Sequence, residues 1–163
     1  MSSVNFSSFI AEFESGYDSA AQEIIWKDQS DQFRHFWSTK VMASNNDPIS
    51  DSDCDEIIKI LDRNGKGNTK KTEAIARAMV SQGAWRRLFN ELHRNQRLRD
   101  VVDRVMKESD LSQRANYIND LYEMDSAQGI YLTGRSGNTI SALIAAYDPF
   151  TNLSIISLKD RRL

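Results

Sequence analysis

The sequence has few of the residues that build metal centres, disulfides or membrane spans. It holds one cysteine, so no disulfide can form within the chain, and its two histidines, His35 and His93, have no Cys or carboxylate partner at the familiar zinc spacings. Its longest apolar stretches, such as residues 140–147, fall far short of the roughly 20 residues that cross a bilayer. We therefore expect no metal, no cofactor and no membrane span.

The lone cysteine, Cys54, lies among Asp51, Asp53, Asp55 and Glu56. Acidic neighbours raise the pKa of a thiol and make the reactive thiolate scarcer. A reduced, unreactive side chain suits the cytoplasm. Because the N-terminus also lacks the basic start and uninterrupted apolar core of a secretory signal, we expect a cytoplasmic protein.

Apolar residues recur mainly at helical spacing, and strand-like alternation is confined to the end of the chain. A content of 40% hydrophobic residues is enough to close one core in 163 residues, and no repeat or low-complexity linker divides the sequence. We predict a single all-α, or nearly all-α, domain over residues 1–163. It should be an orthogonal bundle of about seven or eight helices, with a short extended segment near the C-terminus at residues 150–157.

The expected helices carry apolar stripes that we assign to the core. Ser50 and Asp53 stand at capping-box spacing before one of them, and Gly83 is expected to separate two others. A last helix over residues 138–147 should stop at Asp148 and Pro149. The stripes are Phe6, Phe9, Ile10 and Phe13; Ala20, Ala21, Ile24 and Ile25; Phe33, Phe36, Trp37, Val41 and Met42; Ile57, Ile58 and Leu61; Ile75, Ala78, Met79 and Val80; Trp85, Leu88, Phe89 and Leu92; Leu98, Val101, Val102, Val105 and Met106; and Leu111, Tyr117, Ile118, Leu121 and Tyr122.

Ser157 and Asp160 repeat the capping-box spacing just before the last residue, Leu163. A helix would thus begin where the sequence stops, which indicates a fragment of a longer chain. A natural C-terminus with a frayed basic tail is the competing interpretation.

Charge is segregated along the chain, although the net charge is only −2. Residues 1–60 hold 4 Lys/Arg and 11 Asp/Glu, a formal charge of −7, while residues 61–163 hold 17 and 12, a charge of +5. Between Arg63 and Arg104, 11 basic residues face 4 acidic ones. Such a block attracts polyanions. The alternative is that these side chains are solvated helix faces, paired with the acidic N-terminal part.

Residues 63–74, RNGKGNTKKTEA, form the most polar stretch and are expected to be a loop. The spacing is not that of a Walker loop, so nucleotide hydrolysis is not supported. Glycines with nearby lysines before a helix can still contact a phosphate. The competing interpretation is a mobile surface loop. The candidate phosphate ligands here are Arg63, Lys66, Lys70 and Lys71.

Aromatic and basic residues alternate over residues 85–99. On a helix, Trp85 and Phe89 share the side of the core, which leaves the intervening arginines toward solvent. These arginines could each bind a phosphate with two hydrogen bonds, or could form ion pairs with the N-terminal carboxylates. The candidate ligands are Arg86, Arg87, Arg94 and Arg97.

The segment LTGRSGNTISALIAAYDP, residues 132–149, resembles the hairpin of helix-hairpin-helix proteins. In that family the turn offers backbone amides to a DNA phosphate. The resemblance implies a DNA-binding turn at Gly134, Arg135, Ser136, Gly137, Asn138 and Thr139. The catalytic Asp and the hairpin Lys of the related glycosylases are missing, since Ser157 and Asn138 stand near their places.

A second resemblance covers more of the chain. The order of an aromatic-rich start, a basic loop, a WRRLFN helix, the TGRSGN segment and SIISLKDRRL is similar to helical regions that precede catalytic domains in some prokaryotic restriction-type proteins. It implies a DNA-engaging module with a nuclease or motor beyond Leu163. We therefore expect non-catalytic DNA binding. The alternatives are a protein-interaction module that docks an acidic partner and a divergent glycosylase-like enzyme.

Overall fold

The computed structural model describes residues 6–16, 19–43, 49–61, 80, 82–128, 138–152 and 158–162. Within these residues the chain forms seven α-helices, one π-helical segment and one 3-10 turn, and no strand, so the all-α prediction is confirmed. The elements are α1 (Phe6–Gly16), α2 (Ser19–Phe36), η1 (Trp37–Met42), α3 (Asp51–Leu61), α4 (Gln82–Arg94), α5 (Gln96–Lys107), α6 (Leu111–Gln128), α7 (Asn138–Tyr147) and η2 (Asp160–Arg162).

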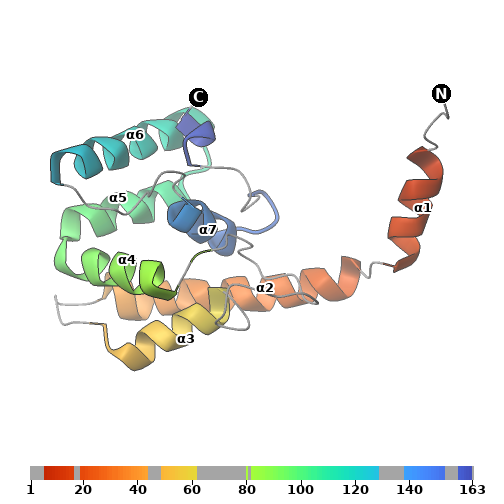
Figure 1. Cartoon of the computed structure of the whole chain (residues 1–163), viewed down its shortest axis with the longest axis horizontal. Helices are drawn as coiled ribbons and strands as arrows, with labels where there is room; N and C mark the ends of the chain where they lie inside the picture. Colours follow the sequence, from red (N-terminus) through yellow and green to blue (C-terminus); the bar gives the residue numbers. More distant parts are fainter. Residues whose placement is uncertain are drawn as a thin grey trace.

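Helices α4, α5 and α6 follow one another back and forth, and α2 and α3 lie along one side of them (Figure 1). Helix α7 occupies the middle, where it packs against α2, α3, α4 and α5. Every side chain from Ile140 to Ala146 is buried. A helix that is apolar on all sides belongs in such a position.

The end of α7 is held by α2. The Tyr147 carbonyl has no partner within its own helix, and it accepts hydrogen bonds from Ser30 Oγ at 2.9 Å and from Arg34 Nη1 at 3.0 Å. The Arg34 guanidinium also lies 5.8 Å from the centre of the Tyr147 ring, within cation–π range. This contact joins parts of the chain that are more than 110 residues apart.

The apolar stripes of α4 and α5 face the core as predicted. Trp85 and Phe89 are buried, with their ring centres 6.2 Å apart, and Leu98 and Val102 are fully buried on α5. Only Asn95 separates the two helices, and its side chain caps α5 by accepting from the Leu98 backbone amide at 3.0 Å.

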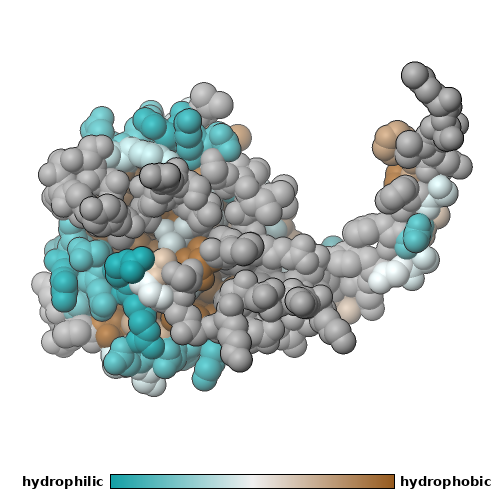
Figure 2. All heavy atoms as spheres, viewed as in Figure 1, coloured by the Kyte–Doolittle hydropathy of each residue, from teal (hydrophilic) through white to brown (hydrophobic). Residues whose placement is uncertain are grey.

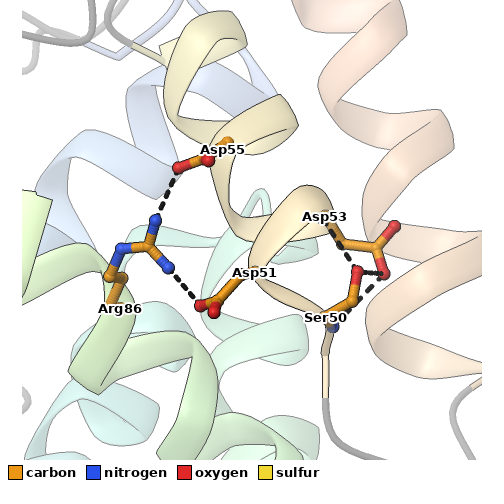
Figure 3. A network of polar contacts seen from close by, with 5 residues as sticks. All are labelled: Ser50, Asp51, Asp53, Asp55 and Arg86. Atoms are coloured by element: carbon orange, nitrogen blue, oxygen red, sulfur yellow. Dashed lines mark hydrogen bonds and ion pairs between the residues drawn. The ribbon is translucent and has the colours of Figure 1, made fainter.

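The capping box before α3 is confirmed. The Asp53 backbone amide donates to Ser50 Oγ at 3.1 Å, and the Ser50 backbone amide donates to Asp53 Oδ2 at 3.3 Å (Figure 3). The hydrogen bond that the Ser50 hydroxyl donates to Asp53 Oδ2 is the main cause that holds the pKa of Asp53 below its usual value. Lys40 and the Ser50 backbone amide add to this shift, and partial burial opposes it.

The residues that follow α7 are hydrogen-bonded to the start of α6. The buried Arg114 donates to the Glu108 carbonyl and, at 2.7 Å, to Asn152 Oδ1. Burial lowers the pKa of this guanidinium, and the charges of Asp148 and Glu108 oppose the shift.

Element η2 lies on α6. The Arg162 guanidinium sits 4.3 Å from the Tyr122 ring centre and donates to Asn119 Oδ1 at 2.7 Å. Asp160 thus begins a 3-10 turn, while its expected capping partner Ser157 lies outside the described residues.

The N-terminal predictions need correction. Residues 20–25 and 33–42 were expected to form separate helices, but α2 runs unbroken to Phe36 and continues into η1. Phe6, Ile10 and Ile24 were assigned to the core and are 74%, 56% and 71% exposed. The reason is that α1 and the neighbouring start of α2, which carries Ile24, stand away from the bundle, and no described helix packs extensively against α1 (Figure 1). Leu111, assigned to the core at the start of α6, is also 72% exposed.

Gly83 was expected to separate two helices, but it lies inside the first turn of α4. Glycine is tolerated there because the first turn depends least on hydrogen bonds within the helix. The expected helix over residues 75–82 and the extended segment after Asn152 fall mostly outside the described residues.

Candidate nucleic-acid interface

The structure describes part of the predicted DNA-binding set. Arg86, Arg87, Arg94 and Arg97 lie on α4 and α5, and Asn138 and Thr139 form the first turn of α7. Nothing is described for Arg63, Lys66, Lys70, Lys71, Gly134, Arg135, Ser136 and Gly137, so those predictions lie outside the described residues.

Arg86 is engaged by the acidic helix α3. Its Nη1 lies 2.5 Å from Asp51 Oδ1 and its Nη2 lies 2.6 Å from Asp55 Oδ1 (Figure 3). The two carboxylates are four residues apart and therefore share one face of α3, which suits the planar fork of a guanidinium. At Arg86 the alternative interpretation of the basic block holds, because this arginine pairs with the acidic N-terminal part.

Arg87 and Arg94 lie on the solvent face of α4. They are seven residues apart, so they share a face two turns and about 10 Å apart along the helix. Both residues are exposed, and the Arg94 side chain is 73% exposed with its nearest carboxylate, Glu91, at 3.9 Å. Their guanidinium groups are accessible to a ligand, in contrast to that of Arg86.

Helix α5 repeats this arrangement. Arg97 and Arg104 are exposed, seven residues apart, and therefore share a face of α5. The Arg104 guanidinium lies 5.9 Å from the centre of the Tyr117 ring of α6. Arg104 was not among the predicted ligands, although its seven-residue spacing from Arg97 could have identified it. We call Arg87, Arg94, Arg97 and Arg104 the α4–α5 arginines.

The acidic residues near these arginines do not neutralise their positive charge. Residues 82–107 hold seven Lys/Arg and three Asp/Glu. Asp103 accepts from Trp37 Nε1 at 2.9 Å and pairs with Lys107 at 2.9 Å. Arg86 is paired with α3 and Arg99 is buried, so the four α4–α5 arginines remain beside two carboxylates, Glu91 and Asp100. The helix pair therefore carries an excess of exposed positive charge that can attract a polyanion.

Cys54 is buried beside the Arg86 ion pairs. Burial raises the pKa of its thiol, Arg86 opposes this shift, and Asp51, Asp53 and Asp55 add to it. The sequence thus predicted the direction of the shift, but burial contributes more than the acidic neighbours do. A thiol of this kind is a poor nucleophile.

Within the described ranges, no three His, Cys, Asp or Glu side chains are grouped so as to hold a metal ion. None of the described helices is both long and apolar enough to cross a bilayer. What the described surface offers is a set of exposed guanidinium groups on two consecutive helices, a geometry suited to binding anions.

No protein-family model, curated protein or solved structure matches this chain.

Proposed function

We propose that this chain is a non-catalytic DNA-binding module in which the α4–α5 arginines contact the phosphate backbone. The observation that carries the proposal is the exposure of four guanidinium groups, two on each of two consecutive helices, in a stretch with few acidic side chains. Arginine binds phosphate with a pair of parallel hydrogen bonds, and such contacts supply most of the sequence-independent affinity for DNA.

The sequence resemblances extend this proposal. If residues 134–139 form a helix-hairpin-helix turn, their backbone amides add a phosphate contact at the start of α7. If the chain is the DNA-engaging part of a restriction or genome-defence protein, cleavage or translocation belongs to another domain or subunit. Both statements rest on the sequence patterns quoted above.

A second candidate is a module that docks an acidic protein. The contact between Arg86 and the carboxylates of Asp51 and Asp55 favours it, because it shows this helix pair binding an acidic helix face. We favour DNA, since four exposed guanidinium groups on two helices can supply several separate phosphate contacts.

The test is the salt dependence of duplex binding by the full chain. Replacing Arg87, Arg94 and Arg97 together by Gln should lower affinity at low salt. The log–log slope against salt should shrink by up to about 2.7, because each lost phosphate contact accounts for roughly 0.9. The matched control replaces Lys27, Lys59 and Lys159 by Gln, which removes the same charge from exposed positions elsewhere.

An unchanged slope in the triple arginine variant, or an equal loss in the lysine control, contradicts the proposal. Arg86→Gln should weaken binding less than Arg87→Gln, since Arg86 is held by α3. A series of duplex lengths compared with an acidic helical peptide separates the candidates. Affinity that grows with duplex length supports DNA, and tight binding of the peptide alone supports the acidic protein partner.

A further inference from the structure

Arg99 on α5 carries a buried positive charge that no described residue pairs. Its side chain is 5% exposed, and its Nε and Nη1 atoms are buried and donate to no acceptor among the described residues. A guanidinium keeps its proton in proteins, so burial cannot remove the charge. Buried charges are paired in stable structures, because an uncompensated one is strongly unfavourable. Arg99 therefore indicates an anionic ligand.

The carboxylates of α5 do not neutralise Arg99. Asp103 lies one turn further along the helix, where it accepts from Trp37 Nε1 and pairs with Lys107. Asp100 follows Arg99 directly, and consecutive residues of a helix do not face each other. An anion from outside the chain is thus needed to balance the buried guanidinium.

Arg99 lies in the first turns of α5, where two backbone amides also have no acceptor within the helix. The Leu98 amide donates to Asn95 Oδ1 at 3.0 Å, and the Arg99 amide donates to the Asn95 carbonyl at 3.0 Å. The amides of Gln96 and Arg97 have no such acceptor in α5, and both residues are exposed. Amides at the start of a helix bind anions, because the helix dipole places partial positive charge there.

Several positive groups meet where α4 turns into α5. Side chains of a helix lean toward its N-terminus, so the Arg99 guanidinium points back toward the same two amides. Arg97 is exposed at the second position of α5, and Arg94, exposed at the end of α4, offsets the partial negative charge of that helix terminus. Figure 2 shows hydrophilic residues on the side of the molecule where α4 meets α5 in Figure 1.

We propose that Arg99, Arg97 and the backbone amides of Gln96 and Arg97 bind one phosphate group. We call these residues the α5 phosphate site. A phosphate group presents several acceptor oxygens, so it can accept from guanidinium groups and amides at the same time. The inference rests on the proposed function, because we take this phosphate to belong to the DNA backbone. It adds one buried anchoring charge to the exposed contacts of the α4–α5 arginines.

The first test measures the unfolding midpoint of the full chain in inorganic phosphate and in chloride at equal ionic strength. A ligand that binds only the folded chain raises this midpoint as its concentration increases. We expect phosphate to stabilise the wild type, and we expect Arg99→Met to weaken phosphate binding at least about tenfold. General effects of phosphate on protein hydration act on both chains equally. In chloride the variant should be at least as stable as the wild type, because methionine is apolar and of similar shape.

A matched pair of substitutions at Gln96 tests the backbone amide. Proline is favoured at the first position of a helix and has no N–H, so Gln96→Pro removes one donor and leaves α5 intact. Asn95 already has the extended backbone that a residue before proline adopts, with φ −123° and ψ 95°. Gln96→Pro should weaken phosphate binding severalfold, whereas Gln96→Ala keeps the amide and should not change it.

Two further variants test the exposed charge. Arg97→Gln should weaken phosphate binding by no more than about fivefold, which corresponds to the roughly 1 kcal/mol of an exposed ion pair. Lys59→Gln removes an exposed cation from α3 and should leave phosphate binding unchanged.

Four outcomes overturn the proposal. The first is a wild type that phosphate stabilises no more than chloride does, and the second is an Arg99→Met chain that responds to phosphate as the wild type does. The third is an equal loss of phosphate binding in Gln96→Pro and Gln96→Ala. The fourth is an Arg99→Met chain far less stable than wild type in chloride, since the guanidinium would then be stabilised within the protein itself.

Duplex DNA distinguishes the two sources of the phosphate. Duplex binding that inorganic phosphate inhibits at constant ionic strength, and that Gln96→Pro weakens, supports a backbone phosphate. If phosphate binds at the α5 phosphate site but the duplex neither binds nor competes, the site takes a small phosphorylated ligand and the DNA-binding function fails alone. A duplex salt slope that depends on the α4–α5 arginines, without any response to phosphate, removes only the α5 phosphate site.

Discussion

Helices α1 and α7 are alike in length, with 11 and 10 residues, and both carry apolar residues at helical spacing. Their environments are opposite. On α7, Ile140 and Ile144 are completely buried, while on α1, Phe6 is 74% exposed. An apolar stripe therefore shows that a helix has something to bury, but it does not show which surface will bury it.

The difference lies in the contacts that other helices supply. Helix α7 is surrounded by α2, α3, α4 and α5, and its last carbonyl is satisfied by Ser30 and Arg34. Helix α1 has no such neighbours among the described helices. For α7 the partner surface belongs to the same chain, whereas the described part of the chain provides no such surface for α1.

The largest expected effect comes from truncating one apolar side chain on each of the two helices. Leu143→Ala on α7 should lower the free energy of unfolding by about 2–5 kcal/mol, because it leaves a cavity in a fully buried site. Phe6→Ala on α1 should change it by less than about 0.5 kcal/mol when measured on the monomer. Urea denaturation of both variants at low protein concentration measures the two values.

Comparable losses in the two variants would contradict the comparison, since Phe6 would then have to be buried within the monomer. A loss for Phe6→Ala that appears only at high protein concentration would instead show that α1 is buried when copies associate. Mass action predicts it if α1 is buried in a dimer.

The sequence predicts the parts of this fold whose signals are local. The buried faces of α4 and α5 follow from the spacing of residues such as Trp85, Phe89 and Val102, and the start of α3 follows from Ser50 and Asp53. Apolar spacing does not predict burial where the covering surface must come from a distant part of the chain. Phe6, Ile10 and Ile24 have core-like spacing, and nothing near them in the sequence reveals that no helix of the same chain covers them.

The same limit applies to the candidate interface. The sequence identifies a basic block and places its arginines on the solvent side of α4 and α5, but it treats Arg86 and Arg87 alike. Only the packing of α3 against α4 brings Asp51 and Asp55 to Arg86 and leaves Arg87 exposed. Pairing between segments some 30 residues apart follows from tertiary structure and cannot be read from spacing along one helix.

A smaller effect is expected at the anchored end of α7. Ser30→Ala removes a hydrogen bond from a buried hydroxyl to the Tyr147 carbonyl and should cost about 1 kcal/mol, with Arg34 still bound to the same oxygen. The matched variant on the exposed helix is Ser15→Ala, whose hydroxyl donates to the Glu12 carbonyl at 2.9 Å on the surface of α1. It should have no measurable effect on chemical denaturation.

Combining Ser30→Ala with Arg34→Met should cost more than the sum of the two single changes. The reason is that the Tyr147 carbonyl loses both partners only in the double variant. Strictly additive losses would show that the anchor does not act as a unit, and a loss in Ser15→Ala as large as that in Ser30→Ala would remove the distinction between the two helices.

The smallest expected effect distinguishes α3 from both α1 and α7, because its start depends on a local capping box rather than on a distant surface. Ser50→Ala should lower stability by about 0.5 kcal/mol near neutral pH, the lower end of the range for an N-cap, because Ser50 is exposed. The hydrogen bond from Ser50 is the main reason that the folded-state pKa of Asp53 is lowered. A carboxylate with a lowered pKa stabilises the folded state above its unfolded pKa of about 4, and this contribution is lost as the pH falls through the folded value.

The difference in the free energy of unfolding between wild type and Ser50→Ala should thus be full above about pH 5 and shrink below about pH 4. Ser52→Ala changes an exposed serine in the same turn and should unfold with the same free energy as wild type at every pH. If this free-energy difference stays constant down to the pH of acid unfolding, the Ser50 hydroxyl stabilises α3 without involving the Asp53 carboxylate.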